Sequence, residues 1–288
     1  MTITIDPKDW QKVLAEVVGT FFFFFIGIGS ISTLVLAQNQ VGALGIFFIA
    51  VAHGFALAVA ISALGHISGA HFNPAVTIGL LTARKIGPVL ALLYILAQLL
   101  GGVMSCLALV AILPQSVWDN PGYHLGNPSV NTNVINITQA IILEAILTFF
   151  LVLAVFGTAV DPRANRIAGF GIGFTVFVDI MVGGPLTGGV MNPARAFAPA
   201  LVTGNWGSDW YVYWVGPILG SIVAALLYSF LFLPKEEEPV VMVPAISDHL
   251  VEPPLSQPAM VHDLSAQEIV EVKPEGEDMG QGPGVGGQ

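Results

Sequence analysis

Six long apolar runs constrain the fold of this chain more than any other feature of its sequence. Each is close to the roughly 20 residues that cross the hydrocarbon core of a bilayer as a helix. The runs lie at residues 13–37, 44–64, 88–113, 138–160, 167–183 and 210–233. Only 10% of the side chains are charged, whereas soluble domains carry about 25%. The sequence therefore predicts an all-α membrane protein with six transmembrane helices.

The positive charges between these runs indicate how the chain is oriented. They fall at the N-terminus, in the second and fourth connections and just past the last run, which six spans place on one side of the membrane. These residues are Lys8, Lys12, Arg84, Lys85, Arg163, Arg166 and Lys235. Since Lys and Arg are enriched in cytoplasmic loops, we expect both termini to be cytoplasmic.

The net charge of −10 is concentrated at the C-terminal end of the chain. Residues 234–288 contribute −9 of it and also hold eight prolines and a glycine-rich end. Such a segment cannot bury enough apolar surface to offset its ordering entropy. We therefore predict a cytoplasmic segment at 1–12, a membrane domain at 13–233 and a disordered, acidic cytoplasmic tail at 234–288. A net-negative chain is not expected to bind nucleic acid.

One short part of the tail has helix-forming potential. Residues 262–269 contain a Ser-x-x-Glu spacing that suits a capping box. This segment could form a helix on an unidentified cytoplasmic partner, although a solvated spacer is the simpler interpretation.

The membrane domain contains an internal repeat. Glu16 and Glu144 each follow a nearby leucine and precede Thr-Phe-Phe by four residues, and the segments at 66–79 and 185–200 both contain Asn-Pro-Ala. The copies cover about 13–113 and 138–233, with three apolar runs in each. The second copy therefore enters the membrane from the opposite face, as in the inverted repeats of transport proteins.

The two Asn-Pro-Ala segments predict helix starts within the membrane. Asn is favoured as an N-cap and Pro at the first helical position. The triplets are Asn73, Pro74, Ala75 and Asn192, Pro193, Ala194. The first predicted helix, at 73–81, would be roughly 13 Å long at 1.5 Å per residue, which is about half a bilayer. Backbone at this depth is tolerated only where it is buried in protein or lines a water-filled cavity, so two re-entrant half-helices predict a pore.

The predicted pore offers both donors and acceptors to water. The amides of Asn73 and Asn192, together with the positive ends of two helix dipoles, face the membrane centre. A water molecule that accepts from both amides interrupts the chain along which a proton would hop. The predicted acceptors are the carbonyls of the residues before the triplets: Gly69, Ala70, His71, Phe72, Gly188, Gly189, Val190 and Met191.

On these motifs, residues 10–233 resemble the aquaporin (major intrinsic protein) family. The resemblance implies that Glu16 and Glu144 brace the re-entrant loops. Snorkelling to the membrane interface is the alternative for either acid, but an acid inside an apolar run is costly and usually has a task. The resemblance also implies close helix crossings and a homotetramer in the lipid bilayer with one pore per subunit. The residues at these crossings are Gly54, Gly101, Gly173 and Gly220.

The family's narrowest point is lined by four positions that lie at fixed distances from the two asparagines. Here they hold His53, Ile180, Gly189 and Arg195. This set is similar to that of certain tonoplast intrinsic proteins and of an ammonia-permeable animal aquaporin, whereas strict water channels have Phe, His, Cys or Thr, and Arg. An isoleucine in place of His removes a polar group and a glycine removes bulk, so we expect a wider and less polar constriction.

Two histidines have alternative interpretations. His53 could instead be a core histidine that plays no part in selectivity. His124 in the third connection is an additional candidate filter residue, because in tonoplast relatives a histidine of that connection reaches the filter. The length of the connection gives no firm alignment.

The resemblance implies passive conduction of water and neutral ammonia, with hydrogen peroxide and urea as further candidates, and exclusion of protons and ions. The membrane could be the plasma membrane or an internal, vacuolar-type membrane. A glycerol or urea facilitator is the nearest alternative, but that branch usually has Asp where this sequence has Ala196. A membrane scaffold that recruits partners through its acidic tail is an alternative from another class.

An enzyme, a metal centre and a bound cofactor are not expected. The single cysteine, Cys106, excludes a disulfide framework and a cysteine-built metal site. The few charged residues are too scattered to supply paired carboxylates or a nucleophile with a base. Asp179, next to Ile180, has no evident partner, and Asn136 begins a glycosylation sequon very close to the fourth run.

Overall fold

The computed structural model describes residues 7–36, 43–164 and 167–234. Those residues form helices and connections, with no β-strand in the described ranges. In chain order the helices are α1 (Pro7–Leu36), α2 (Ala43–Ser68), α3 (Pro74–Thr82), α4 (Pro88–Ile112), α5 (Gln115–Trp118), the 3-10 turn η1 (His124–Gly126), α6 (Ile137–Val155), the π-helical turn η2 (Phe156–Val160), α7 (Ala168–Thr187), α8 (Pro193–Thr203) and α9 (Val212–Leu231). The predicted tail, including the segment at 262–269, lies outside the described residues apart from Pro234.

Within the described ranges, six helices are long and apolar enough to cross a membrane, namely α1, α2, α4, α6, α7 and α9. They confirm the predicted all-α membrane fold. The fifth span is longer than predicted, because α7 runs through Pro185 to Thr187 instead of ending at Gly183. Membrane helices tolerate an internal proline where neighbouring groups satisfy the freed backbone. The helix ends at Gly188, whose φ of 94° lies in the left-handed region that favours glycine.

The two predicted half-helices are present as α3 and α8. The side chain of Asn73 caps α3 and that of Asn192 caps α8, and each helix has proline at its start. At 9 and 11 residues, both are much shorter than the six spans. Asn73 is the N-cap and Pro74 the first helical residue of α3, as predicted, and the helix ends at Thr82, one residue beyond the predicted stretch at 73–81.

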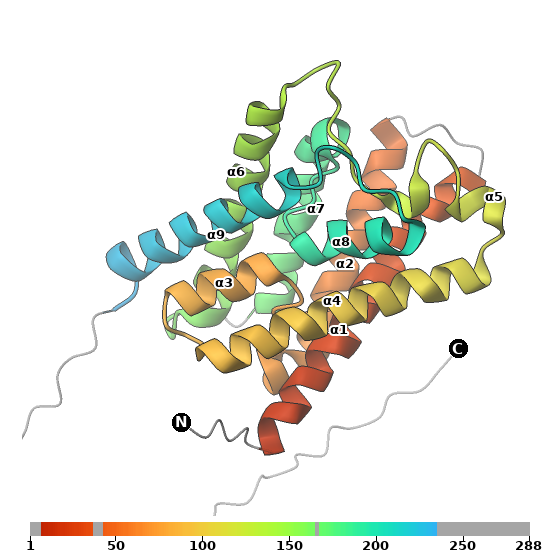
Figure 1. The fold of residues 1–288 in the computed structure, drawn as a ribbon. Helices are drawn as coiled ribbons and strands as arrows, with labels where there is room; N and C mark the ends of the chain where they lie inside the picture. Colours follow the sequence, from red (N-terminus) through yellow and green to blue (C-terminus); the bar gives the residue numbers. More distant parts are fainter. Residues whose placement is uncertain (1–6, 37–42, 165–166, 235–288) are drawn as a thin grey trace, which may run out of the picture. The chain divides into compact units, whose positions relative to one another are not determined.

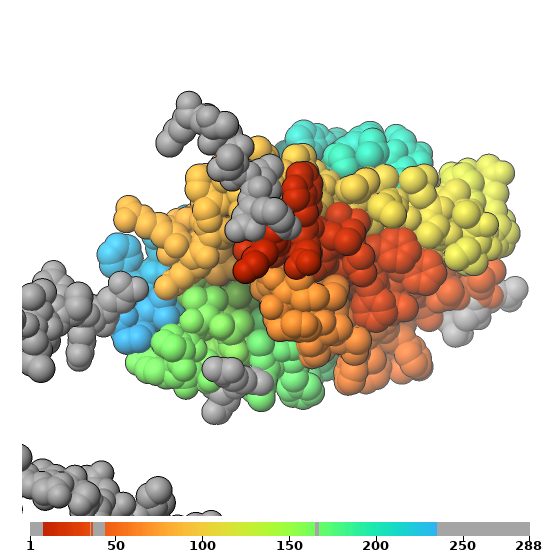
Figure 2. Space-filling model, turned by 90° about the horizontal axis from the view of Figure 1, so that it is seen from below, coloured from red at the N-terminus to blue at the C-terminus, as the bar shows by residue number. Residues whose placement is uncertain are grey.

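Helix packing follows the two copies of the repeat. In the first copy α1 packs on α2 and α4, and in the second α6 packs on α7 and α9. In the view of Figure 2 the start of α1 lies between α2 and α4. The main contact between the copies is that of α2 with α7.

Small residues allow the spans to approach closely, as the sequence predicts. A Cβ on Gly54 would lie 2.6 Å from the carbonyl oxygen of Gly173, and each glycine faces the backbone of the other across the contact between α2 and α7. Gly101 lies in the same way against α1, and Gly220 lies against Ala145 of α6. These contacts confirm the predicted close crossings.

Each half-helix is held by the last span of the other copy, an exchange that the sequence did not predict. Figure 1 shows α3 beside α9, and α8 packs on α4. The hydroxyl of Ser221 in α9 donates to the carbonyl of Ala75 in α3, at 2.5 Å. In α4, a Cβ on Gly102 would lie 3.1 Å from the Cβ of Ala198 in α8. The copies are therefore interlocked and do not simply lie side by side.

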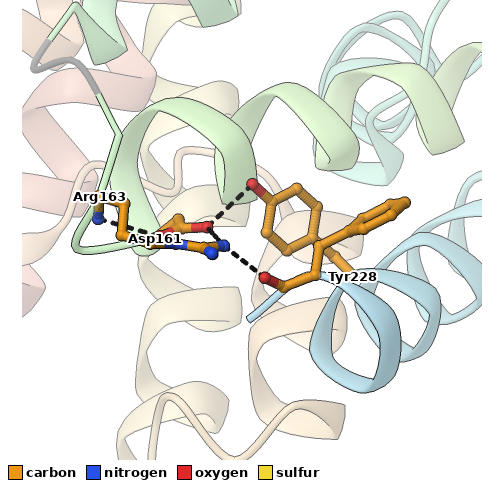
Figure 3. Close-up of polar contacts among 4 residues, drawn as sticks. Asp161, Arg163 and Tyr228 are labelled. Carbon is orange, nitrogen blue, oxygen red and sulfur yellow. Dashed lines mark hydrogen bonds and ion pairs between the residues drawn. The ribbon is translucent and has the colours of Figure 1, made fainter. Parts of the chain in front are cut away.

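The connection between α6 and α7 is tied to the C-terminal end of α9 (Figure 3). The carboxylate of Asp161 accepts bonds from the Nε and backbone N–H of Arg163, both at 2.9 Å, and from its Nη2 at 2.6 Å. The hydroxyl of Tyr228 donates to the same carboxylate at 3.2 Å, and Arg163 also donates to the carbonyl of Phe232. We call these four residues the loop clasp. Donation from Arg163 holds the pKa of the Asp161 carboxyl well below its usual range.

Candidate pore and selectivity filter

The two half-helices begin from the same local arrangement. Asn73 and Asn192 have extended backbones, and their side-chain oxygens accept bonds from the first free N–H groups of α3 and α8. The Asn73 oxygen lies 2.8 Å from the nitrogen of Ala75, and the Asn192 oxygen lies 3.1 Å from the nitrogen of Ala194. The asparagine side chain is thereby fixed at the helix start, as the Asn-Pro sequence predicts.

The remaining half of each asparagine side chain links the two copies. The Nδ2 of Asn73 donates to the carbonyl of Met191, and the Nδ2 of Asn192 donates to the carbonyl of Phe72, both at 2.9 Å. Because an amide NH₂ has two donors, each asparagine retains one N–H for another acceptor. The sequence did not predict this reciprocal pair of bonds, which also occupies one lone pair on each of these two carbonyls.

The loops that lead into the half-helices are held in left-handed conformations. In the first loop, φ is 87° at Gly69, 51° at Ala70 and 47° at Phe72. In the second, φ is 94° at Gly188, 58° at Gly189 and 54° at Met191. Such conformations are strained for residues other than glycine and persist only where the surroundings fix them.

Glu16 supplies part of that support to the first loop. Its carboxylate is fully buried and accepts from the backbone N–H groups of His71, at 3.0 Å, and Phe72, at 2.8 Å. The hydroxyl of Ser68 and the amide of Gln98 complete its bonds, at 2.7 and 2.8 Å. An acid inside an apolar run is thus surrounded by four donors, which is the condition under which burial of a charge is tolerated.

Glu144 does the same for the second loop. It accepts from the N–H groups of Val190, at 3.0 Å, and Met191, at 2.7 Å, and from the hydroxyl of Thr187 at 2.6 Å. Sequence reasoning missed Ser68 and Thr187, although they stand at corresponding places in the two copies. It also missed two tyrosines, Tyr94 and Tyr213, which likewise correspond to each other in the two copies of the repeat. Tyr94 donates to the carbonyl of Ser68 and Tyr213 to that of Thr187, at 2.7 and 3.0 Å.

A cavity of about 1200 Å³ passes along these loops. Its lining extends from Lys12 on α1 and Lys85, just after α3, to Tyr123 and Asn127 in the third connection. Both capping asparagines and all eight residues whose carbonyls were predicted as acceptors belong to the lining. The half-helix starts therefore meet beside one cavity that both copies of the repeat enclose.

The four candidate filter residues also line this cavity, although they come from three separate parts of the chain. His53 lies on α2, Ile180 on α7, Gly189 in the second re-entrant loop and Arg195 in the first turn of α8. The side chains of His53, Ile180 and Arg195 are each less than 7% exposed. The Nδ1 of His53 lies 2.9 Å from the carbonyl of Ile49, so this nitrogen carries the proton that is shared with the carbonyl. A Cβ on Gly189 would lie 3.1 Å from the Cα of Ile180, so the glycine also lets the second loop pass close to α7.

Arg195 is held by the third connection. Its Nη1 donates to the carbonyl of Gly126 at 2.7 Å, and no carboxylate of the described residues forms an ion pair with it. His124, Leu125 and Gly126 all have positive φ, and a Cβ on Gly126 would lie 3.0 Å from Ile31 of α1. A backbone carbonyl of this connection, and not the side chain of His124, thus contacts the arginine. His124 is half-buried and is not part of the cavity lining.

Side-chain hydrogen bonds anchor the third connection. Asn127 donates to the carbonyl of Asn205 at 2.6 Å, and the N–H of Val130 donates to Asp209 at 2.6 Å. Sequence reasoning did not identify these residues, and no motif in the chain marks them. Asp179 lies buried on α7, and its Oδ2 has no hydrogen-bond partner among the described residues. Asn136 caps α6 in a capping box with Gln139.

The sequence matches the major intrinsic protein family over residues 4–228. It is 41% identical over 233 residues to aquaporin TIP4-4 of Zea mays, covering 79% of this chain and 89% of the relative. It is 38% identical over 240 residues to aquaporin TIP2-3 of Arabidopsis thaliana, covering 81% and 92%, and 39% identical over 228 residues to the lens fiber major intrinsic protein of Ovis aries, covering 78% and 82%.

A solved structure shares the fold. The aquaglyceroporin from Plasmodium falciparum superimposes with a TM-score of 0.68 at 24% sequence identity, covering 77% of this chain and 96% of that chain. The inverted repeat, the paired half-helices and the matched length lead to one conclusion: this chain belongs to the major intrinsic protein family, also called the aquaporin family.

Proposed function

We propose that the protein is a passive channel for water and neutral ammonia that excludes protons and ions. The observation that carries the proposal is the meeting of the two capped half-helices beside one cavity, with Arg195 and His53 in its wall. The lining, which extends from Lys12 and Lys85 to Tyr123 and Asn127, supports a path through the membrane domain. The polar groups of the cavity can replace the hydrogen bonds that a small solute leaves in water.

The asparagine pair supports the exclusion of protons. Each Asn amide keeps one N–H free of the reciprocal bonds, on the side chain that caps a half-helix. A water molecule there accepts from the protein and cannot pass a proton onward in the same orientation, while the two helix dipoles raise the energy of a cation. Arg195 adds a full positive charge with no carboxylate bonded to it in the described structure.

The filter composition supports ammonia as a second solute. Ile180 presents an apolar side chain in the filter, at a position where a polar side chain would favour water over ammonia. Substitution of Ile180 tests whether it contributes to this selectivity. Ile180→His is expected to lower the ratio of ammonia to water permeability by about tenfold, the discrimination that one contact makes in a close-fitting site. Stopped-flow recordings on proteoliposomes measure both fluxes.

A matched control lies on the same helix. Ile172 also lines the cavity, two turns before Ile180 on α7, and it is not one of the four filter positions. Ile172→His is expected to change the ratio far less. If both variants keep the wild-type ratio, Ile180 does not select for ammonia.

A glycerol facilitator is the second candidate, and one contact speaks against it. Ala196, where glycerol-conducting relatives usually have Asp, is buried against Val190 and Tyr213. A carboxylate at this position would be enclosed by apolar neighbours. Urea and hydrogen peroxide stay as further candidate solutes because neither needs a polyol site.

Several properties follow from family membership and complete the proposal. We expect a homotetramer with one pore in each subunit, both termini in the cytoplasm, and a location in the plasma membrane or a vacuolar-type membrane. Membership also favours a channel over an enzyme. The acidic tail would recruit a cytoplasmic partner or act as a spacer. A scaffold role without permeability is the alternative, and flux measurements on proteoliposomes would test it.

A further inference from the structure

We propose that Gly27 of α1 is a positioning residue that sets the width of the filter, because it gives the imidazole of His53 a place to withdraw from the pore. This proposal rests on the proposed function in one respect, that His53 belongs to the filter. It goes beyond that function by assigning a role in the filter to α1, a helix that contributes none of the four filter positions.

The face of α1 that borders the cavity is interrupted at Gly27. Phe23 and Ile31, one turn before and one turn after it, both line the cavity, whereas Gly27 does not. The imidazole of His53 lies over the glycine. A Cβ on Gly27 would lie 2.6 Å from Cδ2 and 2.7 Å from Nε2 of the ring.

These separations leave no room for a methyl group. Carbon atoms pack at roughly 3.5–4.0 Å, so a Cβ at this position would displace the ring by about 1 Å or displace α1 itself. Native interiors are close-packed and transmit such a change instead of absorbing it.

Contacts with α1 and α2 restrict how the ring can move. Its Nδ1 is bonded to the carbonyl of Ile49 in the preceding turn of α2, at 2.9 Å. Phe23 packs edge-on against it, with ring centroids 6.1 Å apart. With α1 behind the ring, the open side is the cavity that His53 lines. A larger residue at position 27 would therefore push the imidazole into the lumen.

A double-variant cycle tests this mechanism. In proteoliposomes, Gly27→Ala is expected to lower water and ammonia permeability about tenfold, the effect of one methyl group in a close-fitting site. In the His53→Ala background the same change is expected to have no effect, because no ring is left to displace. The matched control is Gly29→Ala on the same helix, where the nearest atom to a Cβ is the flexible end of Leu109, at 3.3 Å.

Two flux results would overturn the proposal. One is a wild-type permeability for Gly27→Ala. The other is an equal loss with and without the ring at position 53, which would mean that the methyl group displaces α1. If Gly27→Ala alone does not fold, the double variant with His53→Ala decides. A folded double variant supports the clash between the methyl group and the ring, and an unfolded one contradicts it.

A structural measurement separates this proposal from the proposed function. Should wild-type vesicles conduct neither water nor ammonia, the proposed function fails, while the position of the ring can still be compared by cryo-electron microscopy. A shift of the His53 imidazole toward the lumen by about 1 Å in Gly27→Ala supports the role of Gly27. An unmoved imidazole overturns it.

Discussion

At the scale of single residues, the pore depends on a few buried polar groups that are almost completely paired. Glu16 and Glu144 each accept from the backbone of one re-entrant loop, and the two asparagines bond to the loop opposite their own helix. Loops with several positive φ values would not keep this shape without such bonds. The two spans that carry these acids, α1 and α6, therefore hold the re-entrant loops in shape.

This support predicts a large effect of Glu144→Gln. An amide keeps one acceptor oxygen, but its NH₂ group would face an N–H or hydroxyl donor in either orientation, among Thr187, Val190 and Met191. Leaving a buried donor unpaired costs about 1–3 kcal/mol, so we expect a lower midpoint of thermal unfolding in detergent together with reduced water permeability.

Thr187→Val provides the comparison for that variant. It removes one donor to Glu144 and the acceptor of the Gly189 N–H, and leaves the two backbone bonds to Glu144 in place. Because one buried N–H loses its partner, the expected loss is about 1–3 kcal/mol. Equal midpoints for Glu144→Gln and wild type would contradict the bracing role.

At the scale of helices, close crossings and exchanged half-helices hold the two copies together. Gly54 and Gly173 let α2 and α7 meet backbone to backbone, while α3 packs on α9 and α8 on α4. Two of the four filter residues, His53 and Ile180, lie on the helices of the first contact. A change in their separation would therefore alter the filter as well as the stability.

The close contact between α2 and α7 predicts that Gly54→Ala, which adds one methyl group, destabilises the protein strongly. Its Cβ would lie 2.6 Å from the carbonyl oxygen of Gly173, and overpacking of this kind costs about 1–3 kcal/mol. Gly87→Ala is the matched control, because a Cβ there has no neighbour within 4 Å. Thermal unfolding in detergent measures both, and equal midpoints for the two variants would show that α2 and α7 can separate without cost.

The loop clasp predicts how the connection between α6 and α7 responds to acid. Donation from Arg163 lowers the folded-state pKa of Asp161 below the unfolded value of about 3.9. The stabilisation by the clasp is therefore complete above that unfolded value and is lost only as the pH falls through the lower folded-state pKa. Mild acidification should leave it intact.

Asp161→Asn tests this response. Its thermal midpoint should lie below that of wild type by the same amount at about pH 5 and about pH 8, since Asp161 is ionised in the folded protein at both. A difference present at the higher pH and absent at the lower one would show that Asp161 titrates in this range.

At the scale of the whole molecule, most of the architecture could be predicted from the sequence. Hydrophobic length identified six spans, and the two Asn-Pro-Ala triplets identified the half-helices, because capping and proline chemistry act locally. The reciprocal asparagine bonds, the exchange of half-helices and the contact of Gly126 with Arg195 depend on segments far apart in the sequence. Periodicity does not report such contacts.

The same distinction applies to the filter. The family resemblance supplied four positions, and all four line one cavity in the structure. It could not supply Gly27, whose importance arises only from the ring that lies over it. Comparison of the copies would have identified Ser68 with Thr187 and Tyr94 with Tyr213, had corresponding positions been examined for polar side chains.

The central claim is that this cavity conducts water and ammonia without protons. Parallel stopped-flow measurement of water, ammonia, urea and glycerol in one proteoliposome preparation, with an internal pH dye to follow proton leak, tests it most directly. We predict faster water and ammonia fluxes than in protein-free vesicles, slow glycerol flux and an unchanged proton leak. Water and ammonia fluxes equal to those of protein-free vesicles, or a proton leak that rises with the amount of protein, would contradict it.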